Sequence, residues 1–309
     1  MALESLLLQK NPNAEERVHT FRVEIEKTLD QLVSEKPQTS QALLYRAARY
    51  SLLSSAKRLR PLLMLATTEA LGGAVQHALI PSCALELIHT YSLIHDDLPC
   101  MDNDDLRRGR PTLHKVYPEG HALLTGDFLL TYAFEVLATS PHLADGQKVA
   151  LTTVFAKGAG DEGMIGGQLI DLDLAVTGNV PSWELLCEMH NKKTSALLAV
   201  ALESGAIIAN ASTAIRGSLK EIGQMLGLAF QIVDDILDIT GTEQELGKPV
   251  GSDIRNAKIT AVSLLGLDEA RLLAQSLLTS AESRLDQLCT SNDYSCLLCL
   301  VRKLVCRTS

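Results

Sequence analysis

Two clusters of aspartate interrupt segments of this sequence that otherwise read as buried. The first cluster consists of Asp96, Asp97 and Asp102 and follows a run rich in Leu and Ile. The second consists of Asp234, Asp235 and Asp238, flanked by Ile, Val and Phe. A carboxylate is almost never buried alone, because removing a charge from water costs more than packing returns. The six side chains therefore call for a strong positive partner, and divalent metal ions provide one.

The alternative is that each cluster is a solvated patch on a helix, and either cluster alone would fit that interpretation. The second cluster argues against it, because residues 225–239 contain no Lys or Arg. On a helix Asp234 and Asp238 share one face, and Gln231 lies one turn earlier on that face. In the first cluster Pro99 ends the helix, so the following loop must fold Asp102 back toward Asp96. We expect the clusters to be facing walls of one site.

Carboxylate oxygens without Cys or His at ligand spacing favour Mg²⁺ or Mn²⁺ over zinc. Mg²⁺ takes only one or two carboxylates and completes its shell with water and substrate phosphates. The two walls therefore predict a cradle for a phosphorylated ligand that several metal ions bridge. Basic residues that could contact such a ligand are Lys57, Arg60, Arg107, Arg108, Lys193, Lys248 and Lys258. Taken alone, each is more typical of a solvated surface side chain than of a ligand contact. Together with the aspartates, the balance reverses for Arg107, Arg108, Lys57 and Arg60.

The composition is that of a globular protein, with 46% hydrophobic and 21% charged residues among 309. The net charge of −9 argues against a nucleic-acid-binding surface. Seven scattered cysteines form no framework of disulfides, so we expect a reducing, cytoplasmic location. Cys296 and Cys299 have no second pair to complete a zinc site, and we expect them to pack in a helix. The longest apolar stretch, 196–211, is too interrupted to span a membrane.

Helical periodicity dominates the chain, whereas alternation typical of strands is nearly absent. No linker rich in Pro, Ser or Gly divides it, so we expect one all-α domain over residues 1–309. The expected architecture is a bundle of long core helices around a central cavity. The predicted helices are 14–32, 41–55, 76–97, 120–139, 147–156, 182–209, 213–240 and 268–287.

Taken in order, these motifs resemble those of the trans-isoprenyl diphosphate synthases. The resemblance runs from Lys57 to Lys258 and covers most of the chain. Its elements are Lys-x-x-Arg-Pro (57–61), a His before the first aspartates, Arg-Arg (107–108), Gly-Gly-Gln (166–168), Lys-Thr (193–194) and Phe-Gln-x-x-Asp-Asp (230–235). Single motifs of this kind are weak signals, but the ordered set is specific. The resemblance implies the isoprenoid synthase-like fold, a polyprenyl synthetase domain and a homodimer.

The resemblance also implies a role for each matching residue. Mg²⁺ on the allylic diphosphate would be held by Asp96, Asp97, Asp102, Asp234 and Asp238, with Asp235 contributing through water. Contacts to the same diphosphate would come from Arg107, Lys193, Lys248 and Lys258. Isopentenyl diphosphate would be held by Lys57, Arg60, His89 and Arg108. Thr194 and Gln231 would direct oxygens at the developing carbocation.

The implied reaction is head-to-tail condensation of isopentenyl diphosphate with dimethylallyl or geranyl diphosphate to give (2E,6E)-farnesyl diphosphate. Tyr91, five residues before Asp96, would lie about 7.5 Å back along the helix and could stop the growing chain. Tyr at this position, with the Pro99-Cys100 insertion, resembles bacterial farnesyl diphosphate synthases. The run from 98 to 106 is equally similar to plastid-type geranylgeranyl diphosphate synthases, and Tyr91 could instead simply pack.

Two other classes are less consistent with the residues. A terpene cyclase would normally carry an Asn/Ser/Glu-type second metal motif and would lack Lys-x-x-Arg-Pro. A non-catalytic synthase subunit would typically have lost one aspartate cluster, and both are complete here. The chain departs from the family in having Ser55-Ala56 where Gly-Gly is usual and Ala257 where Gly is common. These replacements bear on the geometry of the two loops.

Overall fold

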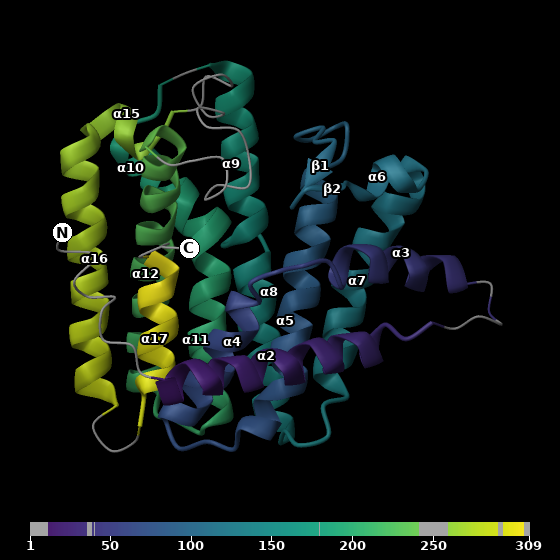
Figure 1. The fold of residues 1–309 in the computed structure, drawn as a ribbon, viewed down its shortest axis with the longest axis horizontal. Coiled ribbons are helices and arrows are strands. Elements are labelled where there is room, and N and C mark those ends of the chain that lie inside the picture. The colour runs from purple at the N-terminus through teal and green to yellow at the C-terminus, as the bar shows by residue number, and fades with distance from the viewer. Residues whose placement is uncertain are drawn as a thin grey trace.

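The computed structural model describes residues 12–35, 39, 41–178, 180–240, 259–289 and 293–305. Helices account for almost all of the regular structure in these residues, which confirms the expected all-α class (Figure 1). The helices are α2 (Pro12–Leu32), α3 (Ala42–Leu52), α4 (Leu59–Ala70), α5 (Val75–Asp96), α6 (Leu113–Val116), α7 (Glu119–Ala138), α8 (Asp145–Ala159), α9 (Met164–Thr177), α10 (Trp183–His190), η1 (Asn191–Ser195), α11 (Ala196–Ile208), α12 (Thr213–Thr240), α15 (Ala261–Leu265), α16 (Leu267–Leu288) and α17 (Ser295–Val305). The strands β1 (Leu106–Arg107) and β2 (Arg110–Pro111) form an antiparallel hairpin.

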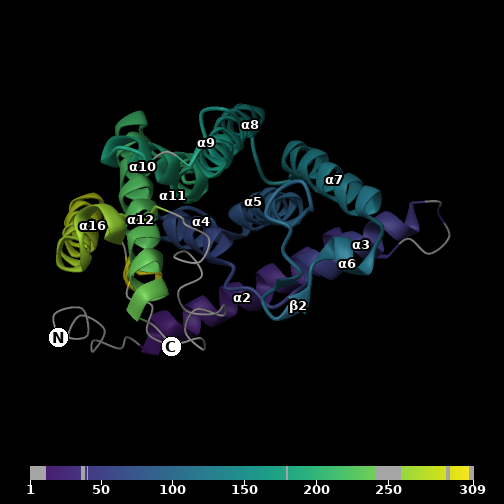
Figure 2. The same ribbon diagram turned by 90° about the horizontal axis from the view of Figure 1, so that it is seen from above.

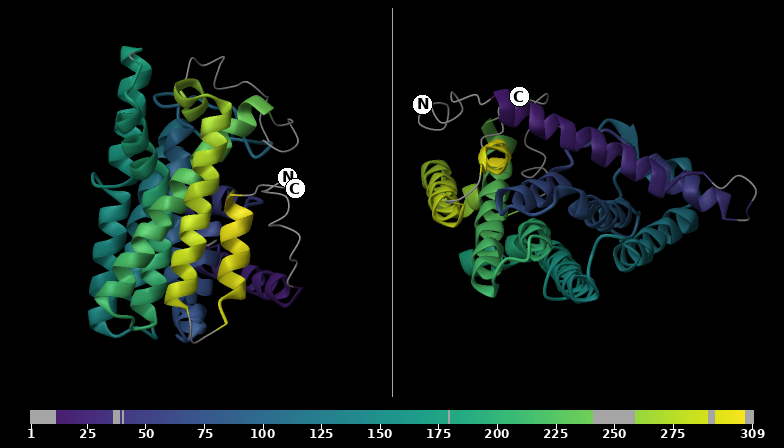
Figure 3. Two further views of the ribbon diagram at one scale, coloured as in Figure 1. Left: turned by 90° about the vertical axis from the view of Figure 1, so that its left-hand side faces the viewer. Right: turned by 90° about the horizontal axis from the view of Figure 1, so that it is seen from below.

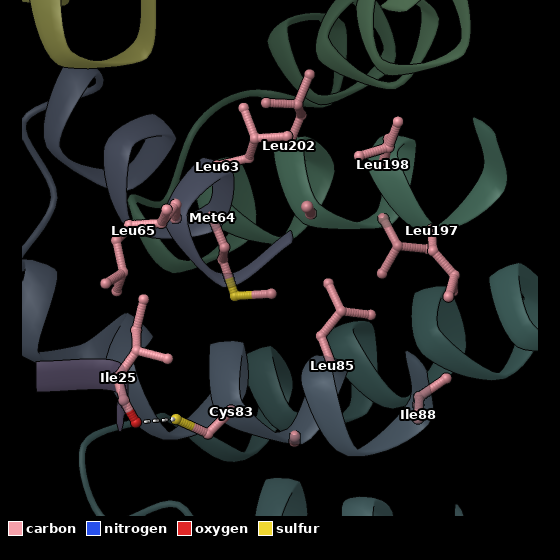
Figure 4. Close-up of a cluster of buried hydrophobic side chains, with 14 of the residues drawn as sticks. Ile25, Leu63, Met64, Leu65, Cys83, Leu85, Ile88, Leu197, Leu198 and Leu202 are labelled. Atoms are coloured by element: carbon pink, nitrogen blue, oxygen red, sulfur yellow. Dashed lines mark hydrogen bonds between the residues drawn. The ribbon is translucent and has the colours of Figure 1, made fainter. Parts of the chain in front are cut away.

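The central layer of the bundle consists of α4, α5 and α11, which are apolar around most of their circumference. Seen from above, α7, α8 and α12 flank this layer, and α16 packs on the outer side of α12 (Figure 2). Helix α2 crosses the others on one side rather than running parallel to them (Figure 3). Apolar side chains of α4, α5 and α11 point toward one another between the helices (Figure 4). Because α11 buries eleven of its thirteen residues, its sequence lacks the amphipathic pattern of a surface helix.

Sequence patterns located most of the helices correctly, and the differences have physical causes. The predicted helix 182–209 is one continuous run, but its centre forms a single π-helical turn, η1. Helix α4 was not predicted, since it reads as an apolar run without a helical period. Helix α9 was not predicted because Gly166 and Gly167 interrupt its pattern. Within the described residues, no helix is long and apolar enough to cross a membrane.

Local signals explain several helix ends. The hydroxyl of Ser182 accepts a hydrogen bond from the Leu185 amide and begins α10, as its sequence suggests. Gly178, in the left-handed conformation at φ 64°, ends α9. Helix α5 ends at Asp96, and α12 ends shortly after Asp238. Both acidic motifs therefore lie at the C-terminal ends of buried helices, as predicted.

Candidate active site

The first acidic motif is formed where α5 ends and the chain reverses. Asp96 is the last residue of α5 and Asp97 is its C-cap. The Asp102 amide donates a hydrogen bond to the Asp96 carbonyl at 2.9 Å. The Asn103 amide donates to the Leu98 carbonyl, and Asn103 has φ 52°. The loop thus brings Asp102 back beside Asp96, as the position of Pro99 predicts.

The β1–β2 hairpin places two arginines beside this motif. Its two central residues, Arg108 at φ 53° and Gly109 at φ 74°, are both left-handed, as a tight two-residue turn requires. The Nε of Arg107 donates to both carboxylate oxygens of Asp97, at 2.7 and 2.9 Å. Burial raises the pKa of Asp97, and this pairing with Arg107 opposes the rise. Asp97 is therefore held by a guanidinium of the protein.

The second acidic motif lies on the last turns of α12. Asp235 and Asp238 are buried, whereas Asp234 is only half-buried. One carboxylate oxygen of Asp235 accepts a hydrogen bond from the Ala261 amide at 2.7 Å. The same oxygen lies 3.9 Å from Nε2 of His190. Asp235 therefore joins α12 to the start of α15, which the sequence does not reveal.

The π-helical turn η1 carries Lys193 and Thr194 between the two motifs. A π turn inside an α-helix is often a functional feature, because it redirects side chains. The Nζ of Lys193 lies 2.5 Å from an oxygen of Asp171 on α9. The Thr194 hydroxyl donates to the Gln231 side-chain oxygen at 3.0 Å. The pair Thr194 and Gln231, predicted to act together, is thus in direct contact.

Glycines allow the neighbouring helices to approach this turn. A Cβ added to Gly167 would lie 2.1 Å from the Lys193 amide nitrogen. A Cβ added to Gly227 would lie 2.3 Å from the Ser195 Cα. Both distances are far below van der Waals contact, so α9 and α12 can pack against η1 only with glycine at these positions. The Gly-Gly-Gln motif therefore has a packing role beside Lys193.

Electrostatic interactions link the two walls through Lys193. Burial raises the pKa of Asp96 to about 6; Asp102 and Asp97 add to the rise, whereas Lys193 and Arg107 oppose it. Burial lowers the pKa of His190 to about 4, which Lys193 reinforces and Asp171 and Asp234 oppose. Lys193 thus interacts with Asp96 of the first motif and with His190, whose pKa also responds to Asp234 of the second motif. In Figure 1 the ends of α5 and α12 lie on the same, upper side of the bundle.

A second basic cluster forms around His89. Burial lowers the pKa of His89 well below its usual value, and the charges of Arg60, Arg108, Arg107 and Arg58 lower it further. Burial, together with repulsion by Arg108, lowers the pKa of Arg60 to about 10. A small cavity opens beside this cluster, and its lining includes Ser54, Thr90, Asp97, Arg107 and Arg108. This cluster is suited to bind an anion.

Tyr91 lies on α5 among core residues and is 4% exposed. Its ring packs edge-on against His95, with 5.7 Å between the ring centroids. Its hydroxyl is buried and has no hydrogen-bond partner in the described part of the chain. Burial and the nearby Asp96 charge raise the pKa of Tyr91 to about 12, so the phenol stays neutral. Tyr91 is therefore close enough to the first motif to sense its charge.

Sequence reasoning named most of these residues. It missed three, since it assigned no role to Arg58, Glu86 or His190. Three positions that it did name, Lys248, Ala257 and Lys258, lie outside the described residues. Glu86 carried a signal, since it is the only acid in the apolar helix α5 before Asp96 at its end. Nothing in the sequence distinguishes His190 from an ordinary core histidine. Cys296 is buried in α17, as expected for packing.

The donor set fits Mg²⁺ that arrives with a diphosphate. Within the described ranges, no three His, Cys, Asp or Glu side chains gather closely enough to enclose a metal ion by themselves. Such a sparse set is unsuited to zinc, but Mg²⁺ needs only one or two carboxylates when phosphate oxygens complete its shell. Burial, with a smaller contribution from Asp102 and Asp97, raises the pKa of Asp96, and a cation beside it would favour the ionised carboxylate.

Comparison with known proteins places the chain in a well-populated group. Residues 41–290 match the Polyprenyl synthetase family. A farnesyl diphosphate synthase of Geobacillus stearothermophilus is 47% identical over 232 residues, which cover 74% of this chain and 77% of that protein. Geranylgeranyl pyrophosphate synthase 7, chloroplastic, of Arabidopsis thaliana is 45% identical over 243 residues, covering 78% and 70%.

Solved structures share the fold as well. The crystal structure of a geranyltransferase from Helicobacter pylori, complexed with magnesium and isoprenyl diphosphate, matches with a TM-score of 0.82. It is 34% identical, and the match covers 96% of this chain and 97% of that one. The arrangement of helices described above is therefore that of isoprenoid synthases.

Proposed function

Because this chain belongs to the polyprenyl synthetase family and is a prenyltransferase, we propose that it makes (2E,6E)-farnesyl diphosphate. The substrates would be isopentenyl diphosphate and an allylic diphosphate, either dimethylallyl or geranyl diphosphate. Tyr91 is the single observation that carries this choice of product. Its buried ring lies on the helix that bears the first acidic motif, where a growing apolar tail would have to pass.

The allylic diphosphate would bind between the two acidic motifs. We assign its magnesium to Asp96, Asp102, Asp234 and Asp238. Asp97 and Asp235 would instead hold Arg107 and the start of α15 in place beside the metal ligands. Magnesium would neutralise charge on the diphosphate as it leaves. Lys193 lies between these walls, and Arg107 is held beside them by Asp97. We propose that Lys248 and Lys258 also contact the allylic diphosphate, as the resemblance implies.

Breaking the allylic C–O bond produces a carbocation and a diphosphate anion. The barrier falls only if the charge of the leaving group is stabilised in place. Unit charges 4 Å apart contribute about 4 kcal/mol at an effective dielectric near 20. The Thr194 hydroxyl, which donates to Gln231, keeps its oxygen lone pairs available to the cation. The final proton can pass to the released diphosphate, so a strong general base of the protein is not required.

Isopentenyl diphosphate would bind in the cluster of Lys57, Arg60, His89 and Arg108. Burial, and then the charges of the arginines, lower the pKa of His89, and burial with Arg108 lowers that of Arg60; a bound anion would offset the repulsion among these positive charges. The small cavity that Arg108 of this cluster lines is also lined by Asp97 and Arg107 of the first motif. The two diphosphates would therefore lie side by side, as condensation requires.

The relatives leave a second product open. Both farnesyl and geranylgeranyl diphosphate synthases are similar to the chain at more than 40% identity. Geranylgeranyl diphosphate is therefore the alternative product. We also propose that the chain acts as one polyprenyl synthetase domain, as a homodimer, in the cytoplasm. The large core cluster, which draws residues from α2 through α17, supports the single domain.

Product analysis after Tyr91→Ala tests the proposed product. The wild type should convert geranyl and isopentenyl diphosphate mainly into a fifteen-carbon product, read by chromatography of the extracted lipid. Removing the ring should shift the main product to twenty carbons or more, because the obstacle to the tail is gone. Phe155→Ala is the control, since it removes a buried ring of α8 and should leave the chain length unchanged. A wild type that makes twenty carbons would contradict the proposal.

A further inference from the structure

Arg58 is a buried cross-link between four parts of the fold. Its side chain is 1% exposed and lies within the Lys-x-x-Arg-Pro segment, between Lys57 and Arg60. Its Nε donates to Glu26 of α2 at 2.8 Å, and Nη1 donates to Glu86 of α5 at 2.8 Å. It therefore points into the protein, away from any position at which it could contact a substrate.

The remaining donors of Arg58 hold the chain that precedes α4. Nη2 donates to the carbonyl of Leu52, the last residue of α3, at 2.6 Å and to the Ser54 carbonyl just after it at 3.4 Å. The same Nη2 donates to the second oxygen of Glu26 at 3.1 Å. One guanidinium thus joins α2, α5 and the turn from α3 to α4. Helix α2 crosses these elements on one side of the bundle (Figure 3).

The backbone of Arg58 is also unusual. It is the N-cap of α4 and has φ 51° and ψ 36°, a left-handed conformation that is unfavourable for a non-glycine residue. Such a conformation persists when the surrounding contacts determine it, and here five hydrogen bonds of the side chain do so. The left-handed turn sets the directions in which Lys57 and Arg60 leave the segment.

The same clamp reaches the other members of the basic cluster. Ser54, whose carbonyl Arg58 holds, accepts a hydrogen bond from Arg108 through its hydroxyl at 3.5 Å. Glu86 is 2% exposed, and its charge raises the pKa of both Arg60 and Arg108, which burial lowers overall. Glu86 therefore offsets part of the repulsion among the arginines that gather around His89.

We propose that Arg58, held by Glu26 and Glu86, is a positioning residue for the pocket that binds isopentenyl diphosphate. This inference rests on the proposed function. Arg58 touches neither substrate, and it acts by fixing the turn that carries Lys57, Arg60 and Ser54. The allylic site has a separate support, because Asp171 and Asp97 hold Lys193 and Arg107. Loss of the clamp should therefore affect one substrate and spare the other.

The experiment compares Arg58→Lys with the wild type in steady-state assays in which each substrate is varied separately. Lysine keeps the charge but cannot form the planar fork to Glu26 or reach both carbonyls. The KM for isopentenyl diphosphate should rise on the order of tenfold, since small misplacements in a binding site have effects of this size or larger. The KM for geranyl diphosphate should stay within about twofold.

Arg49→Lys is the matched control. Arg49 also joins α3 to α2, through Asp30 and the carbonyls of Asp30 and Val33, but it is not part of the basic cluster. The Arg49→Lys substitution should lower the melting temperature but should not raise the KM for isopentenyl diphosphate relative to that for geranyl diphosphate. If Arg58→Lys does not fold, Glu26→Gln replaces it, because this half-exposed residue leaves the pair between Arg58 and Glu86 intact. It should show the same separation at a smaller size.

Two results would overturn the inference. One is an equal change, or no change, in both KM values for the clamp variants. The other is the same separation in Arg49→Lys, which would trace it to general loosening of the fold. A wild type that transfers no prenyl group would instead refute the proposed function. That outcome is distinct, because it is read from the unmodified protein.

Discussion

Asp97 and Asp235, the second aspartates of the two motifs, are both 4% exposed and both accept hydrogen bonds from the protein itself. Arg107 binds Asp97, and the Ala261 amide binds Asp235. Asp96 and Asp234 are half-buried by comparison. Adjacent aspartates that look identical in the sequence therefore differ in the structure. One of each pair is less deeply buried, and the other holds a neighbouring segment in place.

The raised pKa of Asp96 predicts a specific dependence of stability on pH. Burial, with repulsion from Asp102 and Asp97, raises this pKa to about 6, whereas the unfolded carboxyl titrates near 3.9. Between these values the native state binds more protons than the unfolded state. The free energy of unfolding that this group contributes therefore rises as the pH falls from about 6 to about 4.

Urea unfolding of Asp96→Asn in EDTA measures this effect. Above pH 6 the variant should be more stable than the wild type by at most about 3 kcal/mol, because it lacks the buried charge. The gain should nearly disappear near pH 4, where the wild-type carboxyl is protonated in the native state and about half protonated in the unfolded state. Asp161→Asn, at an exposed position, should show no such trend. A gain of equal size at pH 4 and pH 7.5 would rule out an ionised Asp96 as its cause.

At the scale of the elements, the π-helical turn η1 is the part of the fold on which the site most depends. It interrupts a helix that would otherwise be continuous from α10 to α11. The turn places Lys193 next to Asp171 and Thr194 next to Gln231. Two glycines, one on α9 and one on α12, let these helices approach the turn from different sides. The position of the site thus depends on residues that carry no chemistry.

Gly227→Ala should disturb this packing. Its new methyl group would meet Ser195 at 2.3 Å, so η1 must move or α12 must tilt. We expect a loss of stability of about 1–3 kcal/mol and a fall in kcat, since Thr194 precedes the displaced residue. Gly217→Ala on the same helix is the control, because nothing lies within 4 Å of its added Cβ. It should stabilise the protein by up to about 1 kcal/mol, which urea unfolding and turnover assays would check.

The sequence allowed the helices that carry the motifs to be predicted because both are long, and α12 also has a clear polar face. It did not allow α4 to be predicted, since this largely buried helix of 12 residues is too short for its apolar run to be distinguished from a buried strand. The hairpin was missed because strands of two residues are too short to show alternation. The hydrogen bond between Asp235 and Ala261 spans 26 residues, and periodicity within a single helix cannot predict a contact over that separation.

At the scale of the whole molecule, the fold brings together two helix ends that are separated by almost half of the chain. Helices α5 and α12 do not rely on direct contact with each other at the site. They are joined through α11, η1 and the charge of Lys193. The upper side of the bundle in Figure 1 thus collects both acidic motifs, while the apolar layer of α4, α5 and α11 supports them from below.

Calorimetric binding of an S-thiolo analogue of geranyl diphosphate, which resists ionisation, tests whether the two motifs form one site. The measurement would use the wild type, Asp96→Asn, Asp234→Asn and the double variant, each with Mg²⁺ and with EDTA. Residues that share one bound group show coupled losses, whereas independent sites show additive ones. We predict binding that requires Mg²⁺ and a double variant that loses clearly less than the sum of the single losses. Strictly additive losses, or binding that persists in EDTA, would contradict the account.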